Sequence, residues 1–505
     1  MSNNTVILKN TSYLIFRTLI LSVIGLFTVR EVLRLLGVED YGLFNLIFGI
    51  ATLFTFINGA MTSSSQRYLA YYIGNKDQKK LNEVWSNILF LHLLIGVIVC
   101  LSLFFSKEFI LNGLLSINLE YKETSYFIFN LAIVSVFITI FQSPFNALIL
   151  AKEKMSFYAQ ISLLNGVIKL LIVYILYWLS DPLLVKYALL YIFSSLLTCV
   201  IYILYCWKKL NQNTVFKIEN ISLLKEIFFF SSWNIFGNFA SVAKLQGINV
   251  LLNLFFGVAL NAVYALTNTI NGVILGLINS VTTAINPQIY KSYAEENYER
   301  TGVLINIGSK FSFFFCLLVI FPIIFNLQYL LELWLHEIPQ YLVSFVELAL
   351  VVMLIDSLSG TLMTGIQATG KVKIYQIVVS ISVFMNLPLS YLALKFLSDP
   401  WVVYWVALLM SFISLGLRLY FLSQLTKFSI VIYIKSVLVK VLSVVCSSGI
   451  FFWFFNKNFE IHYQMISFFI SSVVTVLIVV ISIILFGLSS AERQFIQNKI
   501  KGYLK

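Results

Sequence analysis

Residues 233–286 read WNIFGNFASVAKLQGINVLLNLFFGVALNAVYALTNTINGVILGLINSVTTAIN, two apolar segments that carry a file of amide side chains. Most of this stretch has the composition of a chain in lipid. Asn234, Asn238 and Asn249 fall on one helical face, with Lys244 beside them. The second segment repeats polar residues at helical spacing: Asn261, Tyr264, Asn268, Asn271, Asn279 and Asn286. Because unsatisfied polar groups are costly in hydrocarbon, we expect both stripes to face other helices or a watered cavity.

The composition of the whole chain agrees with this reading. The 505 residues are 60% hydrophobic and 11% charged, with a mean hydropathy of +0.91. These values exclude a soluble protein and predict an all-α polytopic membrane protein. Apolar runs predict about 14 transmembrane helices, one of them at 41–65. The first run, Tyr13–Leu36, lacks a small-residue cleavage site, so we interpret it as a retained span.

The basic residues predict the orientation of the spans. Most of the 34 Lys and Arg residues fall on one side of the membrane if both termini are cytoplasmic. The net charge of +12 therefore comes from basic residues on the cytoplasmic side, which suits contact with anionic membrane lipid and not with nucleic acid. The 5 cysteines lie in apolar runs and show no disulfide or metal-ligand spacing.

The chain contains an internal repeat. LLGVEDYGLFNL at Leu35–Leu46 matches FFGVALNAVYAL at Phe255–Leu266, and LSDPLLVKYALL at Leu179–Leu190 matches LSDPWVVYWVALL at Leu397–Leu409. Both matches are about 220 residues apart, as expected of two copies of six spans that run in the same direction. We therefore expect an N-terminal lobe at 1–210, a cytoplasmic linker at 211–226, a C-terminal lobe at 227–430, and two further spans with a cytoplasmic tail at 431–505.

Ionisable residues inside the predicted spans are the candidates for function. The cations are Arg17, Arg30, Arg34, Lys169, Lys244 and Lys310, and the acids are Glu31, Glu347 and Asp356. Arg17 either lines a cavity or bonds to a neighbouring helix, and the cluster of Arg30, Glu31 and Arg34 either lines a cavity or neutralises itself. For Lys244 we favour a cavity, because the amide stripe lies beside it.

These considerations give a set of candidate residues without a catalytic constellation. The predicted substrate-binding residues are Arg17, Arg30, Glu31, Asn234, Asn238, Lys244, Asn249, Asn268 and Asn271. Asp356 and Glu31 are the candidates for a coupling ion, although Asp356 is as well suited to a helix contact. The scattered histidines and the absence of a phosphate-binding loop motif predict a protein that is not an enzyme and that uses no cofactor or metal.

Several stretches together point to one family. They are KNTSYLIFRTLI at 9–20, FINGAMTSSSQRYLAYYIG at 56–74, INPQIYKSYA at 285–294 and LIDSLSGTLMTGIQATGK at 354–371. They resemble the bacterial polysaccharide biosynthesis proteins of the oligosaccharide flippase type, within the multidrug, oligosaccharidyl-lipid and polysaccharide exporter superfamily. The resemblance covers nearly the whole chain.

The resemblance implies a bacterial inner-membrane flippase with two six-helix lobes around a central cavity that opens alternately to each side. The implied cargo is undecaprenyl diphosphate-linked oligosaccharide, moved outward for assembly of O-antigen (lipopolysaccharide), capsule or exopolysaccharide. The implied partners are this lipid-linked oligosaccharide, membrane lipid, and the polysaccharide polymerase and chain-length machinery.

The residues themselves fit an anionic, hydroxyl-rich cargo. Cations can hold a diphosphate, and asparagine side chains can hold sugar hydroxyls. One alternative is a cation-coupled multidrug exporter of the same superfamily, whose cavity we would expect to be net acidic. The excess of buried cations over buried acids favours the flippase. A membrane polysaccharide polymerase is a further alternative, but it would ordinarily need a sizeable outer loop or catalytic carboxylates.

Overall fold

The computed structural model describes residues 3–53, 55–114, 122–212, 217–335, 338–458, 464–490 and 492–494. In these ranges the regular elements are helices, and no strand occurs. The described helices include 13 that are long and apolar enough to cross a membrane. The predicted all-α polytopic fold is therefore confirmed. The span expected at 41–65 falls on helical residues to either side of position 54, which lies outside the described residues.

The chain divides into two compact units. Unit 1 comprises Met1–Phe239 and Tyr290–Glu296, and unit 2 comprises Ala240–Ile289 and Asn297–Lys505. One boundary falls inside the helix α7 (Ile221–Phe256), and another falls inside α8 (Val258–Ala294). The polar stripe of α7 is consequently shared, with its first asparagines in unit 1 and its lysine in unit 2.

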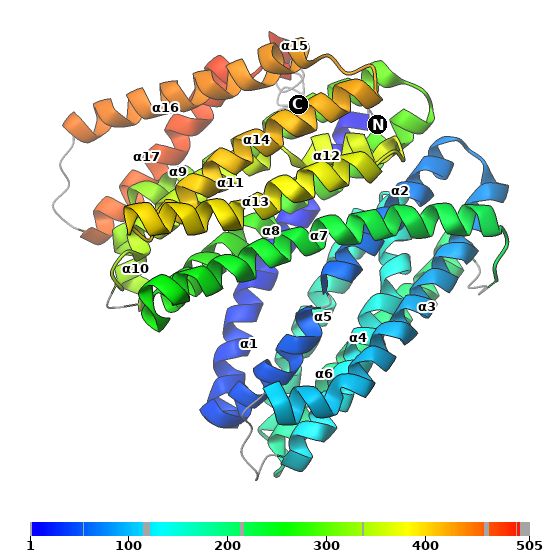
Figure 1. Ribbon diagram of the computed structural model, residues 1–505. Coiled ribbons are helices and arrows are strands. Elements are labelled where there is room, and N and C mark those ends of the chain that lie inside the picture. The colour runs from blue at the N-terminus through cyan, green and yellow to red at the C-terminus, as the bar shows by residue number, and fades with distance from the viewer. Residues whose placement is uncertain are drawn as a thin grey trace, which may run out of the picture. The chain divides into compact units, whose positions relative to one another are not determined.

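Unit 1 is a bundle around α4 (Figure 1). Its other helices are α1 (Asn3–Leu53), α2 (Thr55–Gly74), α3 (Gln78–Phe109), η1 (Ile110–Leu114), α5 (Met155–Leu176), α6 (Leu183–Leu210) and the first part of α7. The central helix α4 (Lys122–Ala151) packs against α1, α2, α3, α5 and α6. Phe44, Ile47, Phe129 and Tyr187 belong to its apolar core, with the rings of Phe44 and Tyr187 4.8 Å apart.

Unit 2 is organised around two long helices, α9 and α14. Its elements beyond α8 are α9 (Tyr298–Phe325), α10 (Leu327–Leu335), α11 (Leu342–Ser357), α12 (Gly360–Ala368), α13 (Lys373–Leu397), α14 (Val402–Leu425), α15 (Ile430–Tyr433), η3 (Ile434–Leu438), α16 (Val439–Asn458), α17 (Gln464–Ser482) and η4 (Ile483–Gly487). Both α9 and α14 pack against α11 and α12, and α17 packs against α9. The rings of Phe345 and Tyr404 pack edge to face in its core, with centroids 5.1 Å apart.

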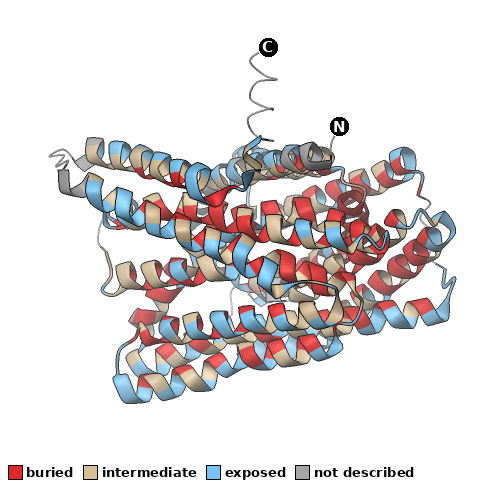
Figure 2. Cartoon of the chain, turned by 90° about the horizontal axis from the view of Figure 1, so that it is seen from above, coloured by how far each residue is buried: buried red, intermediate tan, exposed pale blue. Residues whose placement is uncertain are grey.

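Large apolar side chains cover the outside of the helices. Trp178, Phe396 and Phe105 are 89%, 79% and 78% exposed, and Figure 2 shows exposed and buried residues mixed along the helices visible in it. In water such surfaces would drive association, but lipid tails are as apolar as these side chains. The burial pattern is that of helices whose outer faces meet hydrocarbon.

The internal repeat is visible in the backbone. Gly37 and Gly257 both adopt positive φ, 76° and 78°, and both interrupt a helical run. Only glycine adopts this conformation without a steric cost, which explains the match between the two glycine-containing segments. The helices α3 and α9 also begin alike, because Asp77 and Asn297 each accept a hydrogen bond from the backbone N–H three residues on, at 3.0 Å. These repeated features support the two-copy organisation inferred from the sequence.

Candidate functional site

Arg17 lies on α1 of unit 1 and is half-buried. Its guanidinium stands over the ring of Tyr158 on α5, with Cζ 4.8 Å from the ring centroid. The Nε atom is buried and makes no hydrogen bond with the described protein. A desolvated cation–π contact contributes about 2 kcal/mol or more, so the aromatic face only partly compensates for removing this charge from water. Arg17 therefore keeps an unused donor at a buried position.

The cluster at the end of α1 is engaged within unit 1. Glu31 accepts a hydrogen bond of 2.8 Å from the hydroxyl of Tyr177, and Arg34 Nη1 lies 4.0 Å from Glu31 Oε2. The side chain of Glu31 is 20% exposed, whereas Arg30 is an exposed residue. Glu31 thus has two partners already, and Arg30 points to the surface of its unit.

Asn234 and Asn238 tie α7 to α2 inside unit 1. Asn234 Nδ2 donates to Ser64 Oγ at 3.1 Å and to the carbonyl of Phe230 at 3.2 Å. Asn238 Nδ2 donates to the carbonyl of Phe56 at 3.2 Å. Asn234 is only 4% exposed. Both amides therefore serve a contact between helices, as amides in lipid often do.

Unit 2 contains a charged cluster within its spanning helices. Lys244 of α7 is half-buried and interacts electrostatically with Asp356 of α11 and Arg418 of α14. Arg418 Nη1 donates to Ser359 Oγ at 2.8 Å, while its Nε is buried without a hydrogen bond in the described structure. Asp356 is exposed, and neither cation lies within salt-bridge distance of it. The cluster therefore combines two cations with one acid at a depth where charge is expensive.

The helices α7 and α8 also carry buried amide oxygens in unit 2. The Oδ1 atoms of Asn249, Asn261 and Asn271 are buried and accept no hydrogen bond from the described protein. Asn268 interacts with the hydroxyl of Tyr264 one turn away. Leaving a buried acceptor unpaired costs about 1–3 kcal/mol, so these oxygens are suited to a hydroxyl or water donor.

The structure separates the predicted residues into groups. Arg17, Arg30, Glu31, Asn234 and Asn238 belong to unit 1, whereas Lys244, Asn249, Asn268, Asn271 and Asp356 belong to unit 2. Within unit 2, the charges of Lys244 and Asp356 interact. Within unit 1, the two asparagines are used between helices.

Sequence reasoning missed Arg418 and Tyr158. Arg418 lies one turn inside the end of its predicted span, a place where a long cation is expected to reach the membrane surface. Tyr158 lies in an apolar run that is rich in aromatic residues, so only its contact with Arg17 singles it out.

Two other span cations have partners of their own. Lys169 Nζ donates to the hydroxyl of Tyr191 at 3.1 Å. Lys310 is 4% exposed and donates to both carboxylate oxygens of Glu492 at 2.8 and 2.7 Å. Across the described ranges, no group of three or more His, Cys, Asp and Glu side chains is placed to hold a metal ion.

Comparison with known families gives two matches. A family profile described as "Polysaccharide biosynthesis protein" matches residues 7–293. A second profile, described as MatE, matches residues 240–392. A search of curated protein sequences found no significant match.

Solved structures of transporters share the fold. A MATE protein in the bent conformation superposes with a TM-score of 0.74 at 15% identity, over 84% of this chain and 96% of that chain. A MOP superfamily transporter from Pyrococcus furiosus, described by the "reverse polarity" of its binding pocket, gives 0.73 at 15% identity, over 83% and 96%. An outward-facing multidrug resistance MATE family transporter gives 0.71 at 16%, over 83% and 96%. The chain is similar to these proteins in fold.

Proposed function

Because the chain belongs to the polysaccharide biosynthesis protein family and has the fold of MOP superfamily transporters, we propose that it flips a lipid-linked oligosaccharide across the bacterial cytoplasmic membrane. The cargo is an undecaprenyl diphosphate-linked oligosaccharide, carried outward by alternating access for O-antigen, capsule or exopolysaccharide assembly. Both termini are cytoplasmic in this proposal, and the polymerase and chain-length machinery act on the delivered cargo. The chain itself transports and catalyses no covalent step.

The charged cluster of unit 2 is the observation that carries the proposal. The cluster has two cations, Lys244 and Arg418, and one acid, Asp356. Arg418 already donates one hydrogen bond to Ser359. Two like charges inside spanning helices repel each other in a low dielectric, so an anion between them would be stabilised. A guanidinium and an ammonium together suit a diphosphate, which offers several charged acceptors.

The amides of α7 and α8 suit the sugar part of the same cargo. The buried oxygens of Asn249 and Asn271 need donors, and sugar hydroxyls are donors. A drug-like aromatic cation would leave these oxygens unpaired and would meet the positive charges of the cluster. We assign Lys244, Arg418, Asn249, Asn268 and Asn271 to head-group binding in unit 2.

In unit 1, Arg17 is assigned to anion binding. Its planar guanidinium stands over the ring of Tyr158, and its Nε makes no hydrogen bond with the described protein. Arg30, which is exposed, could meet the anion at an earlier or later stage of transport. Asn234 and Asn238 are assigned to helix contacts, because their amides already donate within unit 1.

The test is delivery of lipid-linked sugar to the outer leaflet in cells that depend on this protein. Lys244→Ala and Arg418→Ala should each reduce delivery about 10- to 100-fold, the loss expected for one hydrogen bond to a charged group. Lys395→Ala is the matched control, since Lys395 is an exposed lysine at the end of α13 in the same unit. Wild-type delivery by both variants, at equal amounts of inserted protein, would remove the cluster from the mechanism.

The MatE match supports one alternative, a cation-coupled exporter of drugs. Such an exporter would use Asp356 as the site of a coupling proton or sodium ion. Asp356→Asn should then abolish drug efflux, and the removal of Lys244 should leave efflux intact or improve it. If the protein is a flippase, removal of Lys244 or Arg418 should reduce transport more than Asp356→Asn does.

Coupling of the flippase to an ion gradient is a separate proposal. Asp356 is exposed, and in the described part of the chain no cation lies within salt-bridge distance of it. Glu31, in contrast, accepts a hydrogen bond from Tyr177. Asp356 is therefore the better candidate of the two. Transport that is insensitive to both proton and sodium gradients would exclude this role for either carboxylate.

A further inference from the structure

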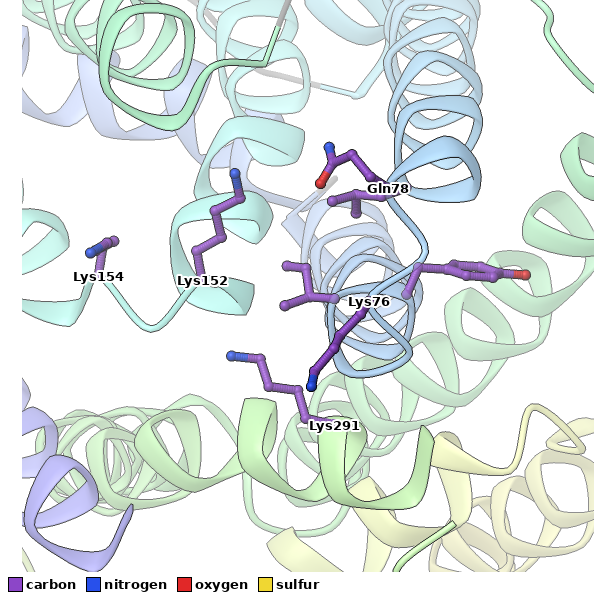
Figure 3. Close-up of a pocket in the computed structure, with 8 residues that line it drawn as sticks. Lys76, Gln78, Lys152, Lys154 and Lys291 are labelled. Atoms are coloured by element: carbon purple, nitrogen blue, oxygen red, sulfur yellow. The ribbon is translucent and has the colours of Figure 1, made fainter. Parts of the chain in front are cut away.

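A basic pocket lies at one end of unit 1, where loops and helix ends meet. It has a volume of about 430 Å³. Four lysines contribute to its wall, with Gln78 and Tyr72 beside them: Lys76 from the α2–α3 turn, Lys152 and Lys154 from the α4–α5 turn, and Lys291 from the last turns of α8. Figure 3 shows these four lysines on three separate segments of the chain, with the side chain of Lys154 directed away from the other three. The positive-inside rule predicts that this end of unit 1 faces the cytoplasm.

The acids near the pocket do not balance the lysines. Glu153 forms an ion pair with Lys291. Asp77 is used at the start of α3, where it accepts the backbone N–H of Lys80. Among the residues that the structure describes, Lys76 and Lys154 have no ion-pair partner. The pocket therefore retains a positive charge beyond what its own carboxylate neutralises.

Lys152 is a partly buried lysine of the pocket. Its Nζ donates to the carbonyl of Leu210 at 2.9 Å, which holds the side chain at the pocket. Burial is the main cause of the lowered pKa of Lys152, and the positive charge of Lys154 makes a smaller contribution in the same direction. An anion in the pocket would oppose both effects, because it would favour the charged form of the lysine.

The internal repeat shows which of these lysines the turns do not require. Lys76 has φ 56° in its turn, and Glu296, at the equivalent position of the second copy, has the same φ. In the other turn Thr369 stands at the position of Lys152 and Gly370 at that of Glu153, whereas Lys371 matches Lys154. The second copy thus makes both turns without counterparts of Lys76 and Lys152, so the folding of the turns does not account for those two charges.

We infer that this pocket binds a phosphate group at the membrane surface, supplied by a lipid head group or by a soluble phosphate compound. Four lysines line a concave site whose volume lies in the range of pockets for small molecules. Basic pockets at the cytoplasmic ends of membrane helices suit anionic lipid head groups. The site is separate from the charged cluster of unit 2 and stands without the transport proposal.

Two probes distinguish the two sources of phosphate. Purified full-length protein in neutral detergent is titrated with inorganic pyrophosphate by calorimetry. The same protein in phosphatidylcholine nanodiscs that contain a minor fraction of phosphatidylglycerol is examined by native mass spectrometry, which counts the anionic lipids retained. Binding of pyrophosphate alone indicates a soluble ligand, retention of phosphatidylglycerol alone indicates a lipid head group, and either result supports the site if the variants below reduce it.

The variant is the triple substitution Lys76→Gln, Lys152→Gln and Lys154→Gln. It should weaken binding of the active probe at least about tenfold, since it removes several charge-assisted contacts. The control replaces Lys79, Lys208 and Lys209 by Gln, which removes the same charge from exposed positions that do not line the pocket.

A second variant guards against a folding defect. Lys76→Gln with Lys154→Gln changes only exposed residues and should show part of the same loss with an unchanged melting temperature. Failure of the wild type to bind either probe would overturn the inference. An equal affinity in the wild type and both pocket variants, or an equal loss in the control, would overturn it as well. Because the readout is binding, neither result depends on whether the protein transports lipid-linked sugar.

Discussion

The ion pair of Lys310 with Glu492 should be one of the strongest single polar contacts in unit 2. Lys310 Nζ lies 2.8 and 2.7 Å from the two carboxylate oxygens, and the two side chains are 5% and 17% exposed. Removing one partner of a buried pair costs about 3–5 kcal/mol, because the other charge stays buried. Glu492 is partly exposed and keeps a hydrogen bond of 2.8 Å from the backbone N–H of Ser489. We therefore expect Lys310→Met to lower the free energy of unfolding by about 2–4 kcal/mol.

A double-mutant cycle tests the reasoning behind this value. Lys310→Met, Glu492→Gln and the double variant are compared by reversible unfolding in mixed micelles with a denaturing detergent. The double variant should lose at least about 1 kcal/mol less than the sum of the single variants, since it leaves neither charge alone. Lys80→Met is the control, because Lys80 is 58% exposed and lies 3.9 Å from Asp77. That exposed pair should be worth less than about 1 kcal/mol.

The same pair predicts a dependence on pH. Burial alone would raise the pKa of Glu492, but the hydrogen bonds from Lys310 and Ser489 outweigh it and hold that pKa below its ordinary value. The lowered pKa means that this stabilisation is present above the ordinary carboxyl pKa and is lost as the pH falls through the value in the folded protein. The difference in stability between wild type and Glu492→Gln should shrink accordingly on acidification. Additive losses in the cycle, or a difference that grows in acid, would refute the account of the pair.

Other substitutions test packing and the division of roles among the predicted residues. Gly74→Ala should destabilise unit 1 by about 1–3 kcal/mol, because its Cβ would lie 2.8 Å from the carbonyl oxygen of Lys291. Gly59→Ala is the control in the same helix. Its Cβ would make only an ordinary contact, so this substitution should not reduce the free energy of unfolding. Asn234→Ala should lower the free energy of unfolding by about 1 kcal/mol and leave transport per folded molecule unchanged, and a loss of transport alone would return this residue to the binding set. Arg17→Lys should keep part of the transport that Arg17→Ala loses, since lysine keeps the charge but not the planar group; equal transport by wild type and Arg17→Ala would exclude a binding role.

The helices and the repeat could be predicted from the sequence because lipid imposes simple rules. A chain in hydrocarbon must satisfy its backbone internally, so long apolar runs become helices whatever their neighbours are. The equivalent positive-φ glycines, Gly37 and Gly257, come from matching segments, so one local conformation explains the match. These features depend on nearby residues or on the solvent, and both are visible in a single sequence.

The partners of polar residues could not be predicted in the same way. An amide stripe looks alike whether it faces another helix or water, and Asn234 meets Ser64 from a helix far away in the chain. Lys310 and Glu492 are separated by 182 positions, so no local spacing could reveal their contact. Arg418 differs again, because its sequence position near a span end favours the surface, while Ser359 holds it inside. Each of these outcomes depends on tertiary packing.

The most direct test of the proposed function is a comparison of two cargoes in vesicles that contain only this protein. Undecaprenyl diphosphate-linked oligosaccharide and a matched sugar lipid without the diphosphate are each placed in the inner leaflet. Their arrival outside is followed with a glycosidase that cannot cross the membrane. We predict rapid transfer of the diphosphate-linked lipid alone, and loss of that transfer in Lys244→Ala with Arg418→Ala. Equal transfer of both lipids, or no transfer beyond that of protein-free vesicles, would contradict the central claim.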